Sequence, residues 1–209
     1  MEADFRRRIN SASTKEEADS VRYERYQWEC EQEGRSSMAR NEWQETTDRL
    51  RANQDRGQAY EDAALDALGI QNNNYSQTPD GQLRSLITYK SDEGIVTRPD
   101  GVTESKWVDV KSQEKGTVYY TDQLRAQKEG ANVGHPDGKQ RNLAVVISNI
   151  NQGDTQPSKP LADSAEVLHR NAQTGKWSFW DKRANKGQGG WQDISDSKAA
   201  YILGAKIPQ

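Results

Sequence analysis

The sequence predicts a mixed α/β fold: a mixed central β-sheet flanked by helices, behind an N-terminal helical extension. The run Asn142–Ile150, NLAVVISNI, is apolar at nearly every position, which is typical of a central strand buried on both faces. Two extended segments, Ile95–Val102 and Lys106–Gln113, precede it, and a helical stretch over 117–131 separates them from it. Residues 1–56 contain no proline and alternate charges of both signs, which predicts the helical extension.

Composition narrows the class of protein. At 209 residues, the chain is one ordinary domain or a smaller domain with an appendage. It is 32% hydrophobic, so the core must be concentrated in part of the chain. The net charge of −3 means that any surface for nucleic acid must be local. Cys30 is the only cysteine, which excludes an intrachain disulfide and zinc sites built on paired cysteines.

The sequence gives no signal for a membrane or for general export. No apolar run approaches the ~20 residues that span a bilayer. The first residues, MEADFRRRIN, lack the apolar stretch of a secretory signal peptide. We therefore expect a soluble protein that is made in the cytoplasm and does not insert into membranes.

The extension is expected to contain two helices, about Lys15–Glu33 and Ser36–Arg56. Its apolar stripe is too sparse for a sustained coiled coil and consists of Val21, Trp28, Trp43 and Leu50. Because such helices gain most of their stability by packing on something else, we interpret 1–56 as a segment for delivery or docking. The main domain is then 57–209.

The main domain is expected to open with a helix over Gln58–Leu68, which Gly69 ends. A loop rich in turn-forming residues follows. The remaining expected elements are a first strand at Leu83–Lys90, the two strands and the helix already given, the buried strand, a short apolar piece at Ala165–His169, a hairpin of Lys176–Trp180 with Gly190–Ile194, and a closing helix over Ser195–Lys206.

Charged residues on two neighbouring strands are the candidate site. Alternate side chains of a strand share a face, so Asp109 and Lys111 point one way while Val108 and Val110 point towards a core. Mg²⁺ takes oxygen ligands, usually one or two carboxylates together with substrate phosphate. Asp100, Asp109 and the backbone carbonyl of Val110 could hold Mg²⁺ or Mn²⁺, and Lys111 could orient a water or help to deprotonate it. The alternative is an exposed strand pair with solvated charges.

Pro99-Asp100, followed by Asp109-Val110-Lys111, resembles the motif of the PD-(D/E)XK nuclease superfamily. The resemblance implies a restriction-endonuclease-like fold and an endonuclease that hydrolyses phosphodiester bonds with Mg²⁺ or Mn²⁺. It favours DNA as the substrate, because DNA is the commoner substrate of that superfamily.

The same resemblance implies two further site residues. Nucleases of this type commonly open with a helix whose glutamate faces the metal, and Glu61 occupies that place in the order of the chain. In several branches, a glutamine on the helix after the catalytic strand points into the site. Gln123 is the first candidate by order, and Gln127 is the second.

Basic residues near aromatic ones suggest where nucleic acid could be contacted, since cations neutralise phosphates and rings stack on bases. In the hairpin, the aromatics could instead cover the edge of the sheet, and single helix charges could simply be solvated. The candidates are Arg125, Lys128, Lys176, Lys182 and Arg183.

A nuclease-like domain behind a charged helical segment also resembles the toxin modules of bacterial polymorphic toxins. This implies delivery by a specialised secretion system into the cytoplasm of a target cell. It implies an immunity protein as a partner, and a carrier or chaperone on the N-terminal helices. Two alternatives remain open: a non-catalytic module that binds nucleic acid or protein, and an RNA-cleaving, restriction or repair nuclease.

Overall fold

The structure, a computed structural model, describes residues 1–75 and 86–206. The chain separates into two compact units, residues 1–55 and 56–209, one residue before the expected boundary. The functional division between the two parts stays a prediction. Among the described residues, no helix is long and apolar enough to cross a membrane.

Unit 1 is helical. It contains α1 (Glu2–Ser11), α2 (Lys15–Gln32) and the first part of α3 (Arg40–Asp66). Helix α2 lies where the sequence predicted it, and the Thr14 side chain caps it by accepting from the Glu17 amide at 3.1 Å. Helix α1 was not predicted.

A buried carboxylate joins α2 to α3 within unit 1. Asp19 accepts two hydrogen bonds from Arg51, at 2.6 and 2.9 Å, and one from Arg22 at 2.8 Å. The hydrogen bonds from Arg51 hold the pKa of Asp19 well below its usual range. The lowered pKa favours the ionised form of Asp19, which holds Arg51 in place through two hydrogen bonds.

The aromatic residues of unit 1 pack mainly against one another. Trp43 lies 5.3 Å from Tyr23 between ring centroids, and Trp28 lies 6.0 Å from Phe5. Two residues of the apolar stripe, Trp28 and Trp43, are thus used for internal packing. Leu50, another residue of the stripe, remains 55% exposed.

Helix α3 corrects one boundary of the prediction. The expected helices Ser36–Arg56 and Gln58–Leu68 are a single helix that continues through Gly57. A glycine inside a helix costs only ~1 kcal/mol relative to alanine, so it need not end one. A Cβ at Gly57 would lie 3.0 Å from Ser112 Oγ, so the glycine lets α3 approach the residue that follows strand β4.

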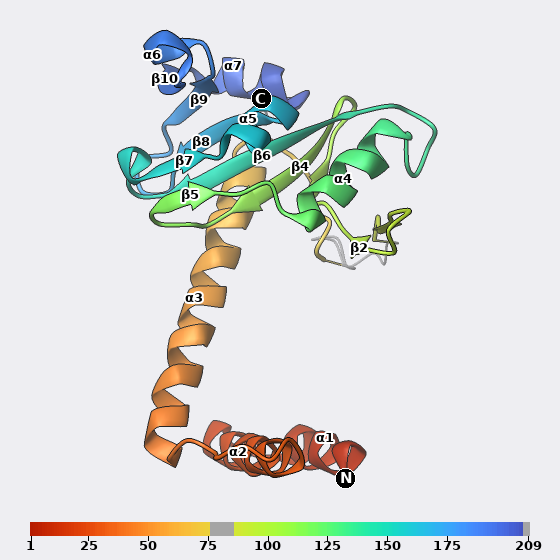
Figure 1. The fold of residues 1–209 in the computed structure, drawn as a ribbon, viewed down its shortest axis with the longest axis vertical. Helices are drawn as coiled ribbons and strands as arrows, with labels where there is room; N and C mark the ends of the chain where they lie inside the picture. Colours follow the sequence, from red (N-terminus) through yellow and green to blue (C-terminus); the bar gives the residue numbers. More distant parts are fainter. Residues whose placement is uncertain (76–85, 207–209) are drawn as a thin grey trace. The chain divides into compact units, whose positions relative to one another are not determined.

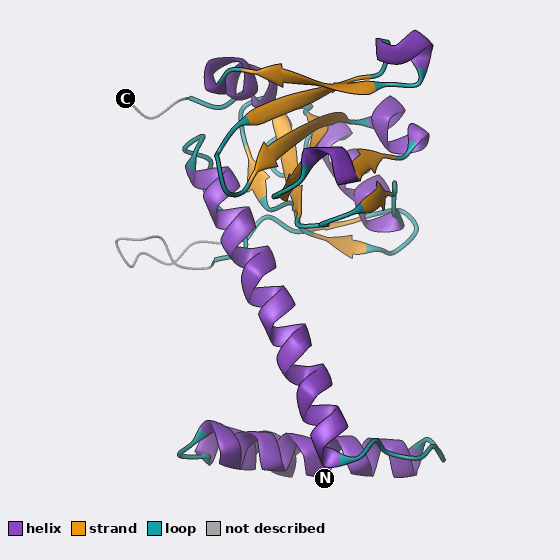
Figure 2. Cartoon of the chain, turned by 90° about the vertical axis from the view of Figure 1, so that its left-hand side faces the viewer, coloured by secondary structure: helices purple, strands orange, loops and turns teal. Residues whose placement is uncertain are grey.

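Unit 2 is built on a six-stranded mixed sheet in the order β10-β9-β8-β6-β4-β3 (Figure 1, Figure 2). Its three inner strands are parallel and the other pairs are antiparallel, and helices flank the sheet, so the predicted mixed α/β architecture is confirmed. The strands are β3 (Gly101–Val102), β4 (Lys106–Lys111), β6 (Asn142–Asn149), β8 (Glu166–Asn171), β9 (Trp177–Asp181) and β10 (Gly190–Ile194).

The expected strand Ile95–Val102 is split around Pro99-Asp100. Its first part, β2 (Val96–Thr97), pairs with β1 (Tyr89–Lys90) in a separate small sheet, and its second part is β3. Proline has no N–H to donate to a ladder, which accounts for the break. Residues 83–85 of the expected first strand lie outside the described residues.

The expected helix over 117–131 begins later than predicted. Thr117 and Val118 belong to β5 (Gly116–Val118), which pairs in parallel with β7 (Thr155–Pro157). Helix α4 (Asp122–Asn132) starts only after Thr121, whose hydroxyl accepts from the Leu124 amide. The remaining elements are η1 (Gln152–Asp154), α5 (Lys159–Ser164), α6 (Ala184–Gly187) and α7 (Asp196–Leu203).

Both faces of the sheet are buried. Val108 and Val110 of β4 pack in a core with residues of α3 and α7, including Leu65 and Leu203. On the other face, Trp107 is fully buried in a second core with Leu124 of α4. Asp109 lies between Val108 and Val110 in the strand, so its side chain belongs to the opposite face, which α4 covers.

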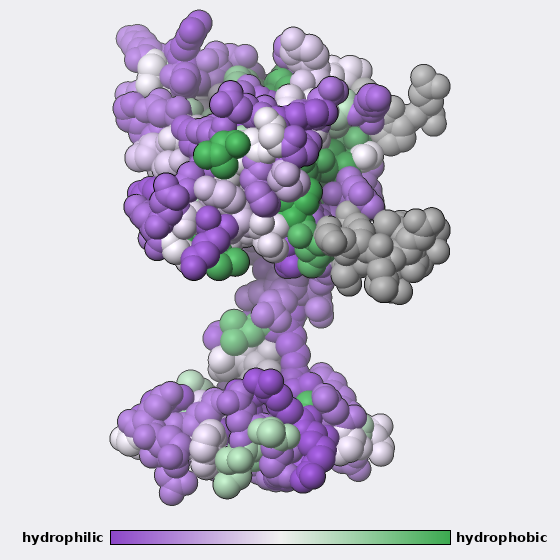
Figure 3. Space-filling model, turned by 90° about the vertical axis from the view of Figure 1, so that its right-hand side faces the viewer, coloured by the Kyte–Doolittle hydropathy of each residue, from purple (hydrophilic) through white to green (hydrophobic). Residues whose placement is uncertain are grey.

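The face of unit 2 that is visible in Figure 3 is mainly hydrophilic, with hydrophobic residues exposed in places.

Helix α4 reaches the sheet through a glycine. A Cβ at Gly130 would lie 2.6 Å from the Trp107 ring and 2.9 Å from the ring of Tyr89. Gly130→Ala should therefore destabilise unit 2 by on the order of 1–3 kcal/mol through overpacking, although alanine is the better helix former. Urea unfolding measures this change.

The matched control is Gly153→Ala, because a Cβ at Gly153 has no neighbour within 4 Å among the described residues. Equal free energies of unfolding for these two variants would contradict the close approach of α4 to Trp107.

Candidate active site

Three of the predicted site residues lie together on β3 and β4. The register pairs Gly101 with Val108, and one residue further along it places Asp100 opposite Asp109. Asp100 Oδ2 accepts from the Val110 amide at 2.6 Å, and Lys111 Nζ lies 2.7 Å from Asp109 Oδ2. Asp109 is fully buried, which an ordinary solvated strand carboxylate would not be.

The Val110 carbonyl is directed to the same side as Asp100. In an extended strand, the N–H and C=O groups of one residue point towards the same neighbour. Because the Val110 N–H points to Asp100, its carbonyl oxygen faces that side as well. The backbone therefore offers the oxygen that the sequence analysis assigned to a metal.

Glu61 reaches the site from α3 through an asparagine. Asn74 Nδ2 donates to Glu61 Oε1 at 2.7 Å and to Asp100 Oδ1 at 2.9 Å. Asn72 Nδ2 donates to the same Glu61 oxygen at 2.7 Å and to Asp62 Oδ1 at 2.8 Å. The sequence analysis treated these asparagines only as loop residues. The sequence signal that could have identified them was the run of three asparagines, Asn72–Asn74, shortly after a helix that carries acids.

Gln127, the second glutamine candidate, contacts the site. Its fully buried side chain donates to Asp109 Oδ1 at 2.8 Å and to the Arg98 carbonyl at 3.0 Å. Gln123, the first candidate, is exposed in the first turn of α4 and lines a cavity beside Asp100. The spacing of Leu124, Gln127 and Ala131 places Gln127 on the buried face of the helix, and this signal could have ranked it first.

The acidic residues of the site affect the pKa values of their neighbours. Burial raises the pKa of Asp100 to about 7, and the nearby charges of Asp109 and Glu61 contribute to the rise. Burial alone would lower the pKa of Lys111, but the carboxylates around it outweigh this, and the pKa is raised. The raised pKa favours the ammonium form of Lys111, which suits orienting a water and stabilising negative charge.

A cavity of about 540 Å³ opens beside Asp100. Among its described lining residues, Arg98 is the one cation, and it immediately precedes Pro99-Asp100 in the chain. An anion that entered this cavity would meet Arg98 and the Asp100 carboxyl together. The sequence analysis overlooked Arg98; its position next to the motif was the available signal. The other lining residues are Asn74, Thr88, Ile95, Val96, Thr97 and Gln123.

The predicted contacts for nucleic acid do not form one surface. Arg125 pairs with Asp122, one turn away on α4, and its guanidinium lies over the Tyr120 ring. Lys128 is partly exposed on the same helix. Lys176 precedes β9, whereas Lys182 and Arg183 follow it, so the strand separates them.

The aromatic residues of the hairpin serve mainly to pack the sheet. Trp177 is buried in the first core. The rings of Trp180 and Trp191 meet edge to face, with 5.0 Å between centroids, and pack against the second core. Of the two interpretations of these aromatics, the structure favours the one in which they cover the sheet.

The donors of the site suit a hard divalent cation. Three carboxyl groups and one backbone carbonyl offer oxygen, and burial together with the nearby charges of Asp109 and Glu61 raises the pKa of Asp100. Among the described residues, no three His, Cys, Asp or Glu side chains are gathered closely enough to hold a metal by themselves. Mg²⁺ does not need such a cluster, because one or two carboxylates, water and substrate phosphate usually complete its shell.

The chain matches no protein-family model, no curated protein and no solved structure. The arrangement of residues at Asp109 is therefore the basis for any functional conclusion.

The pKa of Asp100 predicts how the stability of unit 2 depends on pH. Its folded pKa of about 7 lies above the ordinary value of 3.8, so the native state binds the proton more tightly and loses stability as pH rises between these values. Asp100→Asn removes this loss. At about pH 8 in EDTA, the variant should be more stable than wild type by on the order of 1–3 kcal/mol, and at about pH 4 the difference should nearly vanish.

Thermal or urea unfolding at the two pH values measures the effect. Asp66→Asn, at an exposed position of α3, is the control for removing a negative charge. A stability difference that is the same at both pH values would show that Asp100 is not held above its ordinary pKa.

Proposed function

We propose that this protein is a metal-dependent nuclease of the PD-(D/E)XK type, with the fold of the restriction endonucleases, and that it hydrolyses phosphodiester bonds. The observation that carries the proposal is the buried Asp109 carboxylate, which is held by Lys111 and Gln127 and lies opposite Asp100. Burying a carboxylate and a lysine is costly, and such groups commonly mark a functional site. A strand pair with merely solvated charges would leave Asp109 in water.

Each residue has a distinct role in this proposal. Lys111, protonated at neutral pH, orients the attacking water and stabilises the negative charge that develops on the phosphate. Gln127 fixes the carboxylate that holds Lys111. Arg98 and Gln123 line the cavity through which the phosphodiester reaches Asp100.

Glu61, Asp100, Asp109 and the Val110 carbonyl would hold the Mg²⁺ or Mn²⁺ ion, with Glu61 acting directly or through water. When bound, the ion supplies a Lewis acid for the scissile phosphate and lowers the pKa of a bound water. Asn74 keeps Glu61 and Asp100 close together until the ion is present.

The substrate and the biological setting belong to the same proposal. We favour DNA over RNA, because DNA is the commoner substrate of the superfamily that the motif resembles. We also propose that the protein is a toxin delivered into a target cell and neutralised by an immunity protein, with unit 1 serving its delivery. The support is the separation of a charged helical unit from the unit that carries every proposed site residue.

Cleavage of plasmid DNA and of total RNA tests the activity. With Mg²⁺ or Mn²⁺, the full chain should cleave at least one of the two, and EDTA should abolish cleavage. Asp109→Asn and Lys111→Met should each reduce the rate by about 100-fold or more, since each removes preorganised charge. Gln127→Ala should reduce it about tenfold through loss of positioning.

The matched control for Gln127→Ala is Gln173→Ala, because Gln173 is an exposed glutamine outside the proposed site, whereas Gln127 donates to Asp109. Intact nucleic acid under several divalent ions would overturn the nuclease proposal. Binding without cleavage would instead favour the non-catalytic module.

The division of labour between the units can be tested by truncation. Residues 56–209 should fold and cleave at a rate within a few-fold of the full chain, because all the proposed site residues lie in unit 2. Circular dichroism and the same cleavage assay are the measurements. An unfolded or inactive fragment would show that residues 1–55 belong to the catalytic domain.

A further inference from the structure

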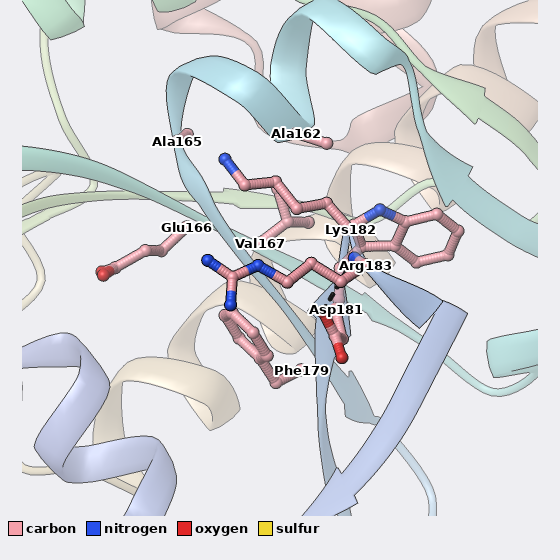
Figure 4. A pocket seen from close by; sticks show the side chains of 9 residues that line it. Ala162, Ala165, Glu166, Val167, Phe179, Asp181, Lys182 and Arg183 are labelled. Carbon is pink, nitrogen blue, oxygen red and sulfur yellow. Dashed lines mark hydrogen bonds between the residues drawn. The ribbon is translucent and has the colours of Figure 1, made fainter. Parts of the chain in front are cut away.

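A second cavity of unit 2, of about 450 Å³, lies where β8 begins and β9 ends. Figure 4 shows the side chains of Lys182 and Arg183 extending across it in the same direction, with their charged ends towards the side of Glu166. Val167 and Phe179 provide apolar surface beneath them. The cavity thus combines two cations with apolar and aromatic walls.

The acids of this cavity are already engaged by other groups. Glu166 Oε2 lies 2.5 Å from Lys106 Nζ. Asp181 accepts from the Arg183 backbone amide and from Gln192, each at 2.9 Å. Among the residues that the structure describes, the side-chain nitrogens of Lys182 and Arg183 make no hydrogen bond or ion pair. Lys106 offsets the charge of Glu166, and the Asp181 carboxylate, whose hydrogen bonds come from neutral donors, offsets one of the two cations. The described residues of the cavity therefore keep an excess of one positive charge.

One further acid lies near Lys182. Asp163 pairs with Lys159 at 2.5 Å, and its charge also interacts with that of Lys182. Because Lys159 is its direct partner, Asp163 compensates Lys182 only in part. Arg183 shares the cavity with the Asp181 carboxylate, which accepts from the Arg183 backbone amide and from Gln192, and its planar fork of donors suits a phosphate.

The aromatic wall is held rigidly. A Cβ at Gly189 would lie 2.4 Å from the Trp180 ring, so the backbone lies directly against that ring. Trp191 packs edge to face on Trp180, and its Nε1 donates to the Thr155 carbonyl at 2.9 Å. A flat ligand would therefore meet a wall that needs no rearrangement, which reduces the entropic cost of binding.

The turn that follows the two cations is strained. Asn185 and Lys186 have φ values of 50° and 59°, in the left-handed region that non-glycine residues rarely adopt. Asn185 Nδ2 donates to the Gly189 carbonyl at 2.9 Å and helps to hold the turn. Strain of this kind gathers at ligand sites, where the surrounding structure holds it in place.

We propose that this cavity binds a nucleoside phosphate, with its phosphate on Lys182 and Arg183 and its base against Phe179. Phe179 and Trp180 are consecutive residues of β9 and pack against opposite cores, so Trp180 is a side wall of the cavity and not a second stacking surface. The inference rests on the proposed nuclease function only for the source of that nucleotide, a strand of the substrate. Val167, in the cavity wall, pairs with Val145, which pairs with Asp109. Because these side chains are buried, a strand that reached both places would have to pass around the core.

The test is a binding titration of the full chain in EDTA, so that no cleavage is needed. A short fluorescein-labelled oligothymidylate is titrated by anisotropy, and thymidine monophosphate and inorganic phosphate are used as competitors. Lys182→Ala combined with Arg183→Ala should weaken binding of the oligonucleotide about tenfold or more and should flatten its salt dependence. Phe179→Leu should weaken binding by about fivefold or more through lost stacking.

The matched control is Lys198→Ala, which removes an exposed cation of α7. It should leave the dissociation constant within about twofold, since it lies outside the cavity. Melting temperatures confirm that the variants fold.

The outcomes separate the possible sources of the ligand. Binding of the oligonucleotide but not of the monophosphate supports the proposal with a strand as the source. Tight binding of the monophosphate supports it with a free nucleotide as the ligand. No binding of either, equal losses in the control variant, or competition by inorganic phosphate as strong as that by the monophosphate overturns it. If the cleavage assay is negative but the oligonucleotide binds in EDTA, the nuclease proposal is refuted, and the proposal that this cavity binds a nucleotide stands.

Discussion

The carboxyl group of Asp109, fully buried in the middle of β4, is the constraint on which the site depends. A carboxylate in such a place is tolerated only with strong partners, and Lys111 and Gln127 supply them. Gln127 can do so only because α4 lies close to the sheet, which requires Gly130 beside Trp107. The position of the helix, the choice of a glycine and the state of the lysine all follow from one buried side chain.

The central strand and the chemistry of the motif could be predicted from the sequence. The apolar run of β6 and the alternation along β4 each reflect a periodicity that the chain carries locally. The elements that were wrong depend on tertiary contacts. Gly57 continues a helix because Ser112 approaches it, and Thr117 pairs with a strand some forty residues later.

The residues of the site divide in the same way, into those that a local pattern predicts and those that tertiary contacts bring in. Asp100, Asp109 and Lys111 could be brought together from strand geometry alone, because they lie on neighbouring segments. Asn74 and Arg98 lie in loops, where the run of asparagines and the position next to the motif are weak signals that fix no geometry. Gln123 was ranked ahead of Gln127 by its order in the chain, although the spacing of Leu124, Gln127 and Ala131 already placed Gln127 on the buried face of the helix.

The balance of charge around Asp109 has a thermodynamic consequence. Among the described residues, the acids Glu61, Asp62, Asp100 and Asp109 outnumber the nearby cations Lys111 and Arg98. Such a field repels a polyanion. Any cation that neutralises it must raise the affinity for nucleic acid, and by reciprocity nucleic acid must raise the affinity for that cation by the same factor. Each of the two ligands would then increase the occupancy of the other.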